Sequence, residues 1–177
     1  MKNKSVRFIT RAAIIAALYF VLTYVMWVFG SGAIQLRVSE ALCVLPLLLP
    51  EAVPGLFIGC LVSNLLGGGA PLDVIFGSIA TLLGAFFTYK IGYKRPEISN
   101  PKYWLAMACP VISNMLITGT VVWYCYGFSG FGVAENHAFG FLPLTMLTVG
   151  IGEALAVFGL GTLLYLALRR LPENVLN

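Results

Sequence analysis

The sequence predicts an all-α integral membrane protein with six transmembrane helices, forming a single membrane domain over residues 1–177. Of the 177 residues, 59% are hydrophobic and only 10% are charged, and the mean hydropathy is +0.91. Long, nearly uncharged runs recur along the whole chain, whereas a soluble domain needs more polar residues to cover its surface. The helices are expected at about residues 8–29, 38–50, 52–67, 72–92, 102–126 and 141–169.

The first segment, residues 8–29, is typical of a membrane helix rather than of a cleaved signal peptide. It is longer than the apolar core of a signal peptide, and no convincing small-residue cleavage site precedes Arg37. Small residues near its start are spaced by four, which predicts a smooth face against which another helix can pack closely. These residues are Ala12, Ala13, Ala16 and Ala17.

The second and third segments are short. A dozen residues of α-helix extend about 18 Å, well below the roughly 30 Å of a hydrocarbon core. Pro46, Pro50 and Pro54 crowd this region, so kinked, tilted or partly unwound helices are expected. An alternative interpretation joins residues 41–66 into one broken helix, which gives five spans.

The distribution of positive charge favours six spans. With six spans and a cytoplasmic N-terminus, ten of the eleven basic residues lie on the cytoplasmic side, as the positive-inside rule requires. Five spans would place the cluster from Lys90 to Lys102 opposite the N-terminal cluster. Both termini are therefore expected in the cytoplasm, with Arg37 on the outer side. The ten cytoplasmic residues are Lys2, Lys4, Arg7, Arg11, Lys90, Lys94, Arg95, Lys102, Arg169 and Arg170.

The outer half carries an excess of acids. Glu40, Asp73, Glu135 and Glu153 lie there with Arg37 as the only cation. An acid in a membrane helix costs about 2.5–3.5 kcal/mol on insertion scales, so it normally faces a partner, a cavity or a ligand. Glu153 is the clearest case, because it lies inside a long apolar run with no basic residue nearby. The alternative is a protonated glutamic acid that bonds a neighbouring helix carbonyl.

Two amides, Asn64 and Asn114, also interrupt apolar runs, and Asp73 lies close to one of them in the sequence. Asn114 lies near the middle of the fifth segment, where it either faces a ligand or ties two helices together. Asn64 precedes the run Gly67-Gly68-Gly69 and Asp73 follows it. Asp73 is either a ligand-binding carboxylate or the N-cap of the fourth helix.

The stretch from Gln35 to Glu40 alternates polar and apolar residues. An extended segment of this pattern points Gln35, Arg37 and Ser39 the same way, towards a pocket or towards water. The alternative is a solvated loop with a surface pair between Arg37 and Glu40. The candidate ligand-binding residues are therefore Gln35, Arg37, Glu40, Asn64, Asp73, Asn114 and Glu153.

Several catalytic and metal-binding motifs are missing from the sequence. It has no G-x-x-x-x-G-K-[ST] phosphate loop, no G-x-S-x-G elbow and no H-E-x-x-H pair. Four cysteines without a C-x-x-C pair and a single histidine predict no metal site, and no cofactor is expected. The positive charge is attributed to orientation in the bilayer rather than to nucleic-acid binding. A membrane enzyme that uses Glu40 and Glu153 as acid–base groups stays open as an alternative.

The run from Ile34 to Ala85 resembles the QueT family, whose members are substrate-binding S-components of energy-coupling factor (ECF) transporters. The blocks R-V-S-E-A-L and D-V-I-F-G-S-I-A-T-L-L carry the resemblance. It implies uptake of queuosine precursors, which are 7-deazaguanines such as the aminomethyl and cyano forms. It also implies a scaffold membrane subunit, docked on the alanine face, and two cytoplasmic ATPases. S-components of this type are thought to bind substrate outside and then to topple in the membrane.

The polar residues suit such a ligand. A 7-deazaguanine presents N–H donors along one edge, which a carboxylate accepts in bidentate fashion. The aminomethyl form adds a cation, for which a second acid is suited, and its acceptors need Asn, Gln or Arg37 as donors. We therefore expect a multi-pass transporter subunit of the cell membrane rather than an enzyme. An S-component for another vitamin or purine is the main alternative.

Overall fold

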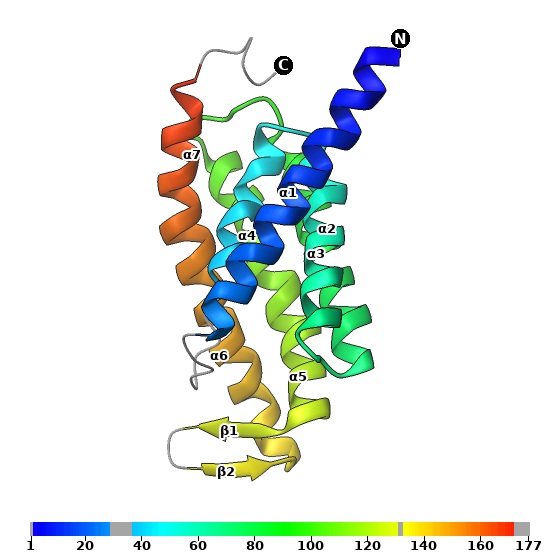
Figure 1. Cartoon of the computed structure of the whole chain (residues 1–177). Helices are drawn as coiled ribbons and strands as arrows, with labels where there is room; N and C mark the ends of the chain where they lie inside the picture. Colours follow the sequence, from blue (N-terminus) through cyan, green and yellow to red (C-terminus); the bar gives the residue numbers. More distant parts are fainter. Residues whose placement is uncertain (1, 29–36, 131–132, 172–177) are drawn as a thin grey trace.

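The computed structural model describes residues 2–28, 37–130 and 133–171, and it is helical apart from one short hairpin (Figure 1). Gln35, a predicted site residue, lies outside the described residues. The helical elements are α1 (Lys2–Val28), η1 (Val38–Leu47), α2 (Ala52–Leu66), α3 (Pro71–Gly92), α4 (Pro101–Ser113), η2 (Asn114–Thr118), α5 (Gly119–Tyr126), η3 (Phe139–Phe141), α6 (Leu142–Ala154), η4 (Leu155–Gly161) and α7 (Thr162–Arg169).

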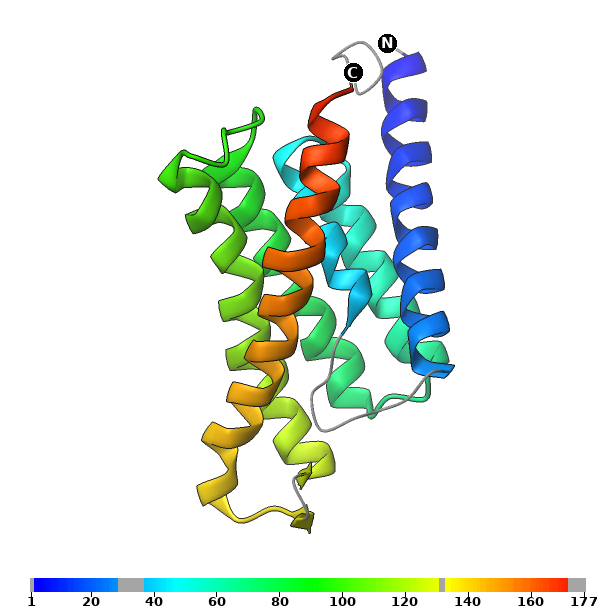
Figure 2. The ribbon, with the colours of Figure 1, turned by 90° about the vertical axis from the view of Figure 1, so that its left-hand side faces the viewer.

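The described helices pack side by side into an elongated bundle (Figure 1). In chain order they group into six helical stretches, here called passes: α1, η1, α2, α3, the continuous run α4–η2–α5 and the continuous run from η3 to α7. By length and composition, four segments are long and apolar enough to cross a membrane: Lys4–Met26, Pro71–Gly92, Pro101–Tyr126 and Phe139–Arg169. The start of α1 and the end of α7 share one end of the bundle, here called the basic end (Figures 1 and 2).

The second pass, η1, is a 3₁₀-helix in the middle of the bundle (Figure 2). Every residue from Ser39 to Leu47 is buried, and η1 contacts α1, α3, α7 and η4. A 3₁₀-helix rises about 2.0 Å per residue against 1.5 Å for an α-helix, so ten residues extend about 20 Å instead of 15 Å. The predicted helix over residues 38–50 is therefore shorter in sequence, ending at Leu47, but stretched in space.

Small residues let α1 and α2 approach closely. A Cβ added at Gly59 would lie 2.7 Å from the Tyr19 Cβ and 2.9 Å from the Ala16 carbonyl oxygen. Similarly, a Cβ at Gly55 would lie 2.8 Å from the Ala12 carbonyl oxygen. Glycine at both positions therefore allows a helix contact that a larger residue would prevent.

This contact divides the four alanines that were expected to form one docking face. Ala12 is buried and Ala16 is half-buried, because both face α2. Ala13 and Ala17 are exposed. Residues one position apart in a helix are separated by about 100°, which places the two pairs on different faces. Ala12 and Ala16 thus serve internal packing, and only Ala13 and Ala17 remain for a partner.

A two-stranded antiparallel hairpin follows α5, at the end opposite the basic end (Figure 1). It pairs β1 (Phe128–Gly130) with β2 (Val133–Asn136), and α5 ends before it at Gly127, whose φ of 66° favours glycine. The all-α prediction omitted this hairpin. Strands of three and four residues are too short to produce the alternation that identifies a strand in a sequence.

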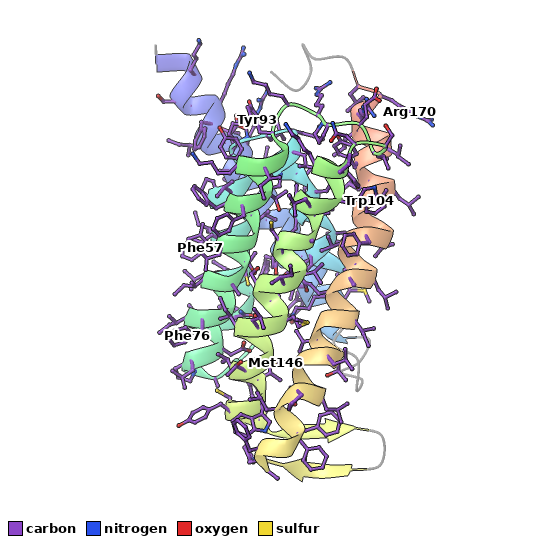
Figure 3. All side chains as sticks on the ribbon, turned by 180° about the vertical axis from the view of Figure 1, so that it is seen from behind. Phe57, Phe76, Tyr93, Trp104, Met146 and Arg170 are labelled. Atoms are coloured by element: carbon purple, nitrogen blue, oxygen red, sulfur yellow. The ribbon has the colours of Figure 1, made fainter. Side chains whose placement is uncertain are left out.

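Basic residues gather at the basic end, and Arg37 lies away from them at the start of η1. Among the described ion pairs there, Arg11 contacts Glu51 and Arg169 contacts Glu97, each at 3.4 Å. Figure 3 shows Tyr93 and Arg170 at this end, whereas Met146 lies towards the opposite one. The positive charges are therefore as asymmetric in space as the sequence predicts.

The outward surface of the helices is apolar. Side chains such as Ile9, Leu105 and Leu163 are 60–66% exposed, and Phe57 and Phe76 point away from the bundle (Figure 3). So much exposed apolar surface is typical of a protein that lipid surrounds. The bundle thus combines a lipid-compatible surface with a buried interior in which polar groups gather.

Candidate functional site

A small cavity lies where η1, η2 and α6 meet. Its lining residues are Arg37, Asn114, Thr118, Val149 and Glu153. The space has room for about one water molecule. Three residues predicted from the sequence, Arg37, Asn114 and Glu153, therefore line the same cavity.

Asn114 and Glu153 link the run α4–η2–α5 to the run from η3 to α7. The Asn114 Nδ2 donates a 2.7 Å hydrogen bond to the Glu153 Oε1. The Thr118 hydroxyl donates to the Asn114 Oδ1 at 2.9 Å, which fixes the orientation of the amide. All three side chains are buried, so Asn114 does tie helices together while it also lines the cavity.

Both helices change their winding at this level. The π-helical segment η2 begins at Asn114, and the π-helical segment η4 begins two residues after Glu153. A π-turn holds an extra residue, which shifts side chains relative to the regular helix, and such turns are frequent at functional sites. Two of them beside one cavity independently indicate a functional site.

Glu40 lies in the first turn of η1 and is fully buried. The Tyr19 hydroxyl donates to its Oε1, and the Cys43 thiol donates to its Oε2 at 3.0 Å. Its carboxyl group lies within electrostatic range of that of Glu153. The interpretation of Glu40 as half of a solvated surface pair with Arg37 is therefore wrong.

Arg37 is the N-cap of η1, with an extended backbone at φ −92° and ψ 93°. Burial lowers the pKa of its guanidinium, but the nearby acids, Asp73 foremost, raise it by more, so that the net pKa is above the ordinary value. Arg37 is thus a fixed positive charge at the cavity. It balances part of the negative charge that the acids bring.

Asn64, near the end of α2, and Asp73, near the start of α3, lie close together. A Cβ added at Gly77 would lie 3.1 Å from the Asp73 Oδ1 and 3.2 Å from the Asn64 Nδ2, so both side chains lie over this glycine. Asp73 is only 6% exposed, and among the described residues its Oδ1 has no hydrogen-bond partner. The N-cap of α3 is Ala70, so the interpretation of Asp73 as the N-cap is wrong.

The predicted residues therefore form two adjoining groups. The first contains Glu40, Asn114 and Glu153; the second contains Asn64 and Asp73. Arg37 lies at the cavity, within electrostatic range of acids from both groups.

Sequence reasoning missed Tyr19, Cys43 and Thr118. Thr118 follows Asn114 by four residues and Cys43 follows Glu40 by three, which is the spacing at which helical side chains meet. Thr118 and Cys43 could therefore have been predicted from the sequence. Tyr19 is 21 residues from Glu40, and no local pattern connects them.

Comparison with known proteins gives one match. A family model described as QueT transporter matches residues 9–170, a range that includes every described residue of the site. No curated protein and no solved structure matches the chain significantly. The family match covers most of the chain and thus extends well beyond the blocks between Ile34 and Ala85.

Proposed function

Because the chain belongs to the QueT transporter family, we propose that it is the substrate-binding S-component of an ECF transporter for a queuosine precursor. The preferred ligand is a 7-deazaguanine such as 7-aminomethyl-7-deazaguanine. The observation that carries this choice is the group of buried Glu153, buried Asn114 and half-buried Arg37 around one cavity. An anionic vitamin would meet an excess of carboxylates there.

Each polar group has a role in this proposal. The Glu153 carboxylate accepts the N–H donors of the guanine-like edge, and Arg37 donates to the ring carbonyl. Asp73, whose Oδ1 has no hydrogen-bond partner among the described residues, attracts the ammonium group of the aminomethyl form. The cavity is far smaller than such a ligand, so entry requires the lining side chains to move apart.

We place the basic end in the cytoplasm and the hairpin on the outer side, with all six passes within the cell membrane. The gathering of basic residues at one end supports this orientation. The site then opens outwards, since Arg37 starts η1 at the end away from the basic residues. The stretched form of η1 supports a six-span arrangement despite its ten residues.

The partners in this proposal are a scaffold membrane subunit and two cytoplasmic ATPases, which supply the energy for uptake. Without a phosphate loop of its own, the chain depends on them for ATP hydrolysis. The exposed pair Ala13 and Ala17 offers a smooth strip on α1 for the scaffold.

Isothermal titration of the purified full chain with 7-aminomethyl-7-deazaguanine tests the proposal. We expect saturable one-to-one binding, weakened at least tenfold by Glu153→Gln and unchanged by Glu97→Gln, an acid at the basic end. Guanine and thiamine serve as competing ligands. Tight binding of thiamine with no binding of the deazaguanine would refute the substrate assignment. Conversion of the ligand by the isolated chain would instead support the membrane-enzyme alternative.

A further inference from the structure

The buried oxygen of Asp73 lies in the first turn of α3, where a carboxylate usually finds a partner. Ala70 is the N-cap of this helix, so Asp73 is its third residue. An acid at this position commonly accepts a hydrogen bond from the N–H of the N-cap residue, as in a capping box. No described hydrogen bond reaches the Asp73 Oδ1, although the residue is only 6% exposed. The usual partner in the same turn is therefore left unused.

The N–H of Ala70 has a different acceptor. It donates a 2.6 Å hydrogen bond to the hydroxyl oxygen of Tyr126, the last residue of α5. An N–H group directed at one acceptor is lost to another, so this bond competes with a capping bond to Asp73. The two bonded residues are 56 positions apart, and the bond depends on the packing of α5 beside α3. The end of α5 thus decides whether Asp73 can pair within its own helix.

Gly77 gives the carboxyl group of Asp73 room on its other side. A Cβ added at Gly77 would lie 3.1 Å from the Asp73 Oδ1 and 3.2 Å from the Asn64 Nδ2, which is tighter than ordinary van der Waals contact. Because Gly77 lies one turn further along α3, the carboxyl group is directed along the helix rather than back to Ala70. Filling this room would push the carboxyl group towards the N-cap.

An oxygen held in this way is suited to a cation that arrives from elsewhere. The start of a helix favours a negative charge, so Asp73 is well placed as a carboxylate. A buried acceptor without a donor raises the free energy of the protein until a partner binds it. Asp73 belongs to none of the described ion pairs. A ligand ammonium group supplies both the missing donor and the opposite charge.

We infer that Tyr126 is a specificity-determining residue, which holds the Ala70 N–H away from Asp73 and so keeps that carboxylate free for a cationic group of the ligand. The inference deepens the proposed function and rests on it for the identity of the ligand. The ammonium group of the aminomethyl form donates to the free Oδ1. The cyano form has no such donor, so Tyr126 favours the aminomethyl form over the cyano form.

The first part is tested without any ligand, by NMR of the full chain in micelles. Isotope labels on glycine carbonyl carbons and alanine nitrogens select the amides of the Gly-Ala pairs, which end at Ala33, Ala70 and Ala85. The signal that disappears in Ala70→Ser identifies Ala70. Its amide proton then reports whether a nearby carboxyl group accepts its hydrogen bond as the pH is varied.

In Tyr126→Phe, we expect the Ala70 amide proton to shift as Asp73 titrates, because the freed N–H now donates to the carboxylate. The shift is expected to be absent from Tyr126→Phe/Asp73→Asn and small in the unmodified protein. Tyr124→Phe, at a 65% exposed tyrosine of the same helix, is the matched control and behaves like the unmodified protein. An equal response in the unmodified protein and in Tyr126→Phe would overturn the inference.

The second part is tested by calorimetry with the aminomethyl and cyano forms. Tyr126→Phe is expected to weaken binding of the aminomethyl form about 3- to 10-fold, as for one lost hydrogen bond, and to leave the cyano form unchanged. Gly77→Ala, which crowds Asp73 from the other side, is expected to give the same selective loss. In an Asp73→Asn background, Tyr126→Phe has no further effect on the preference between the two ligands.

The outcomes separate the inference from the proposed function. Equal losses for the two ligands in Tyr126→Phe would show a merely structural role for Tyr126 and overturn the inference, while the deazaguanine assignment stands. Failure of the unmodified protein to bind either ligand would refute the substrate assignment and, with it, the second part. The NMR result still decides whether Tyr126 keeps the Ala70 N–H from Asp73.

Discussion

The Asn114 Nδ2 lies 2.7 Å from the Glu153 Oε1, and this hydrogen bond joins the run α4–η2–α5 to the run from η3 to α7 beside the cavity. Each residue begins or closely precedes a π-helical segment. An amide accepts a hydrogen bond through its oxygen and donates one through its nitrogen. The hydrogen bond from Thr118 therefore fixes how the Asn114 amide faces the carboxyl group of Glu153. Thr118 lies four residues after Asn114 in the same helical run.

Thr118→Val tests this dependence. The change removes the hydroxyl that donates to the Asn114 Oδ1 and keeps nearly the same shape, so the amide can turn away from Glu153. We expect ligand affinity to fall about 3- to 10-fold, which corresponds to roughly 1 kcal/mol. Thr120→Val is the matched control, because the Thr120 hydroxyl bonds only its own helix at the Leu116 carbonyl. Equal losses in both variants would contradict the role of Thr118.

A double-mutant cycle on Arg37 and Asp73 tests the charge balance at the cavity. Arg37→Gln leaves the acids of the site without their cation, and Asp73→Asn removes the acid that most strongly raises the pKa of Arg37. We expect the double variant to be more stable than the sum of the single changes predicts, by about 1–2 kcal/mol. Unfolding in mixed micelles measures the difference.

The exposed pair of Arg169 and Glu97 is the control for this cycle, with side chains 34% and 71% exposed. Its coupling is expected between about 0 and 1 kcal/mol, since water screens exposed charges. Coupling between Arg37 and Asp73 no larger than this would show that the two charges act independently.

The sequence predicts those site residues whose polar side chains raise the free energy of inserting a helix into lipid. Asn114 and Glu153 stand out because a polar side chain in an apolar run needs a partner, and the structure brings the two together. The long helices could also be predicted from the sequence, because a helix that crosses a membrane needs a long apolar stretch. The partner of Glu40 could not be predicted from the sequence, because Tyr19 contacts Glu40 only through the packing of α1 on η1.

Other features depend on geometry that a single sequence does not encode locally. The 3₁₀ form of η1 begins at Val38, well before Pro46, so no local residue pattern accounts for it. The alanines of α1 belong to two faces, and only the glycines of α2 decide which face is covered. Neither the stretching nor the choice of face follows from residue spacing in one helix.

Gly59→Ala tests the close contact between α1 and α2. The new methyl group would lie 2.7 Å from the Tyr19 Cβ, so α1 must shift and carry Tyr19 away from Glu40. We expect a loss of about 1–3 kcal/mol in stability, measured by unfolding in mixed micelles. Gly159→Ala, where no atom lies within 4 Å of the added group, is expected to leave stability unchanged or slightly higher. A tolerated Gly59→Ala would contradict the tight packing of these helices.

Tryptophan substitutions on α1 separate docking from internal packing. Ala13 is exposed among the described residues, so Ala13→Trp is expected to preserve thermal stability and ligand affinity. Transport by the assembled complex is expected to be lost, because the indole prevents close approach of a partner helix. Ala16→Trp meets α2 at Gly59, so it is expected to lower stability and ligand affinity together. Ile14→Trp, at an exposed residue of the same helix, is the control for size and retains transport. If Ala13→Trp transports as well as Ile14→Trp, the scaffold docks elsewhere on the bundle.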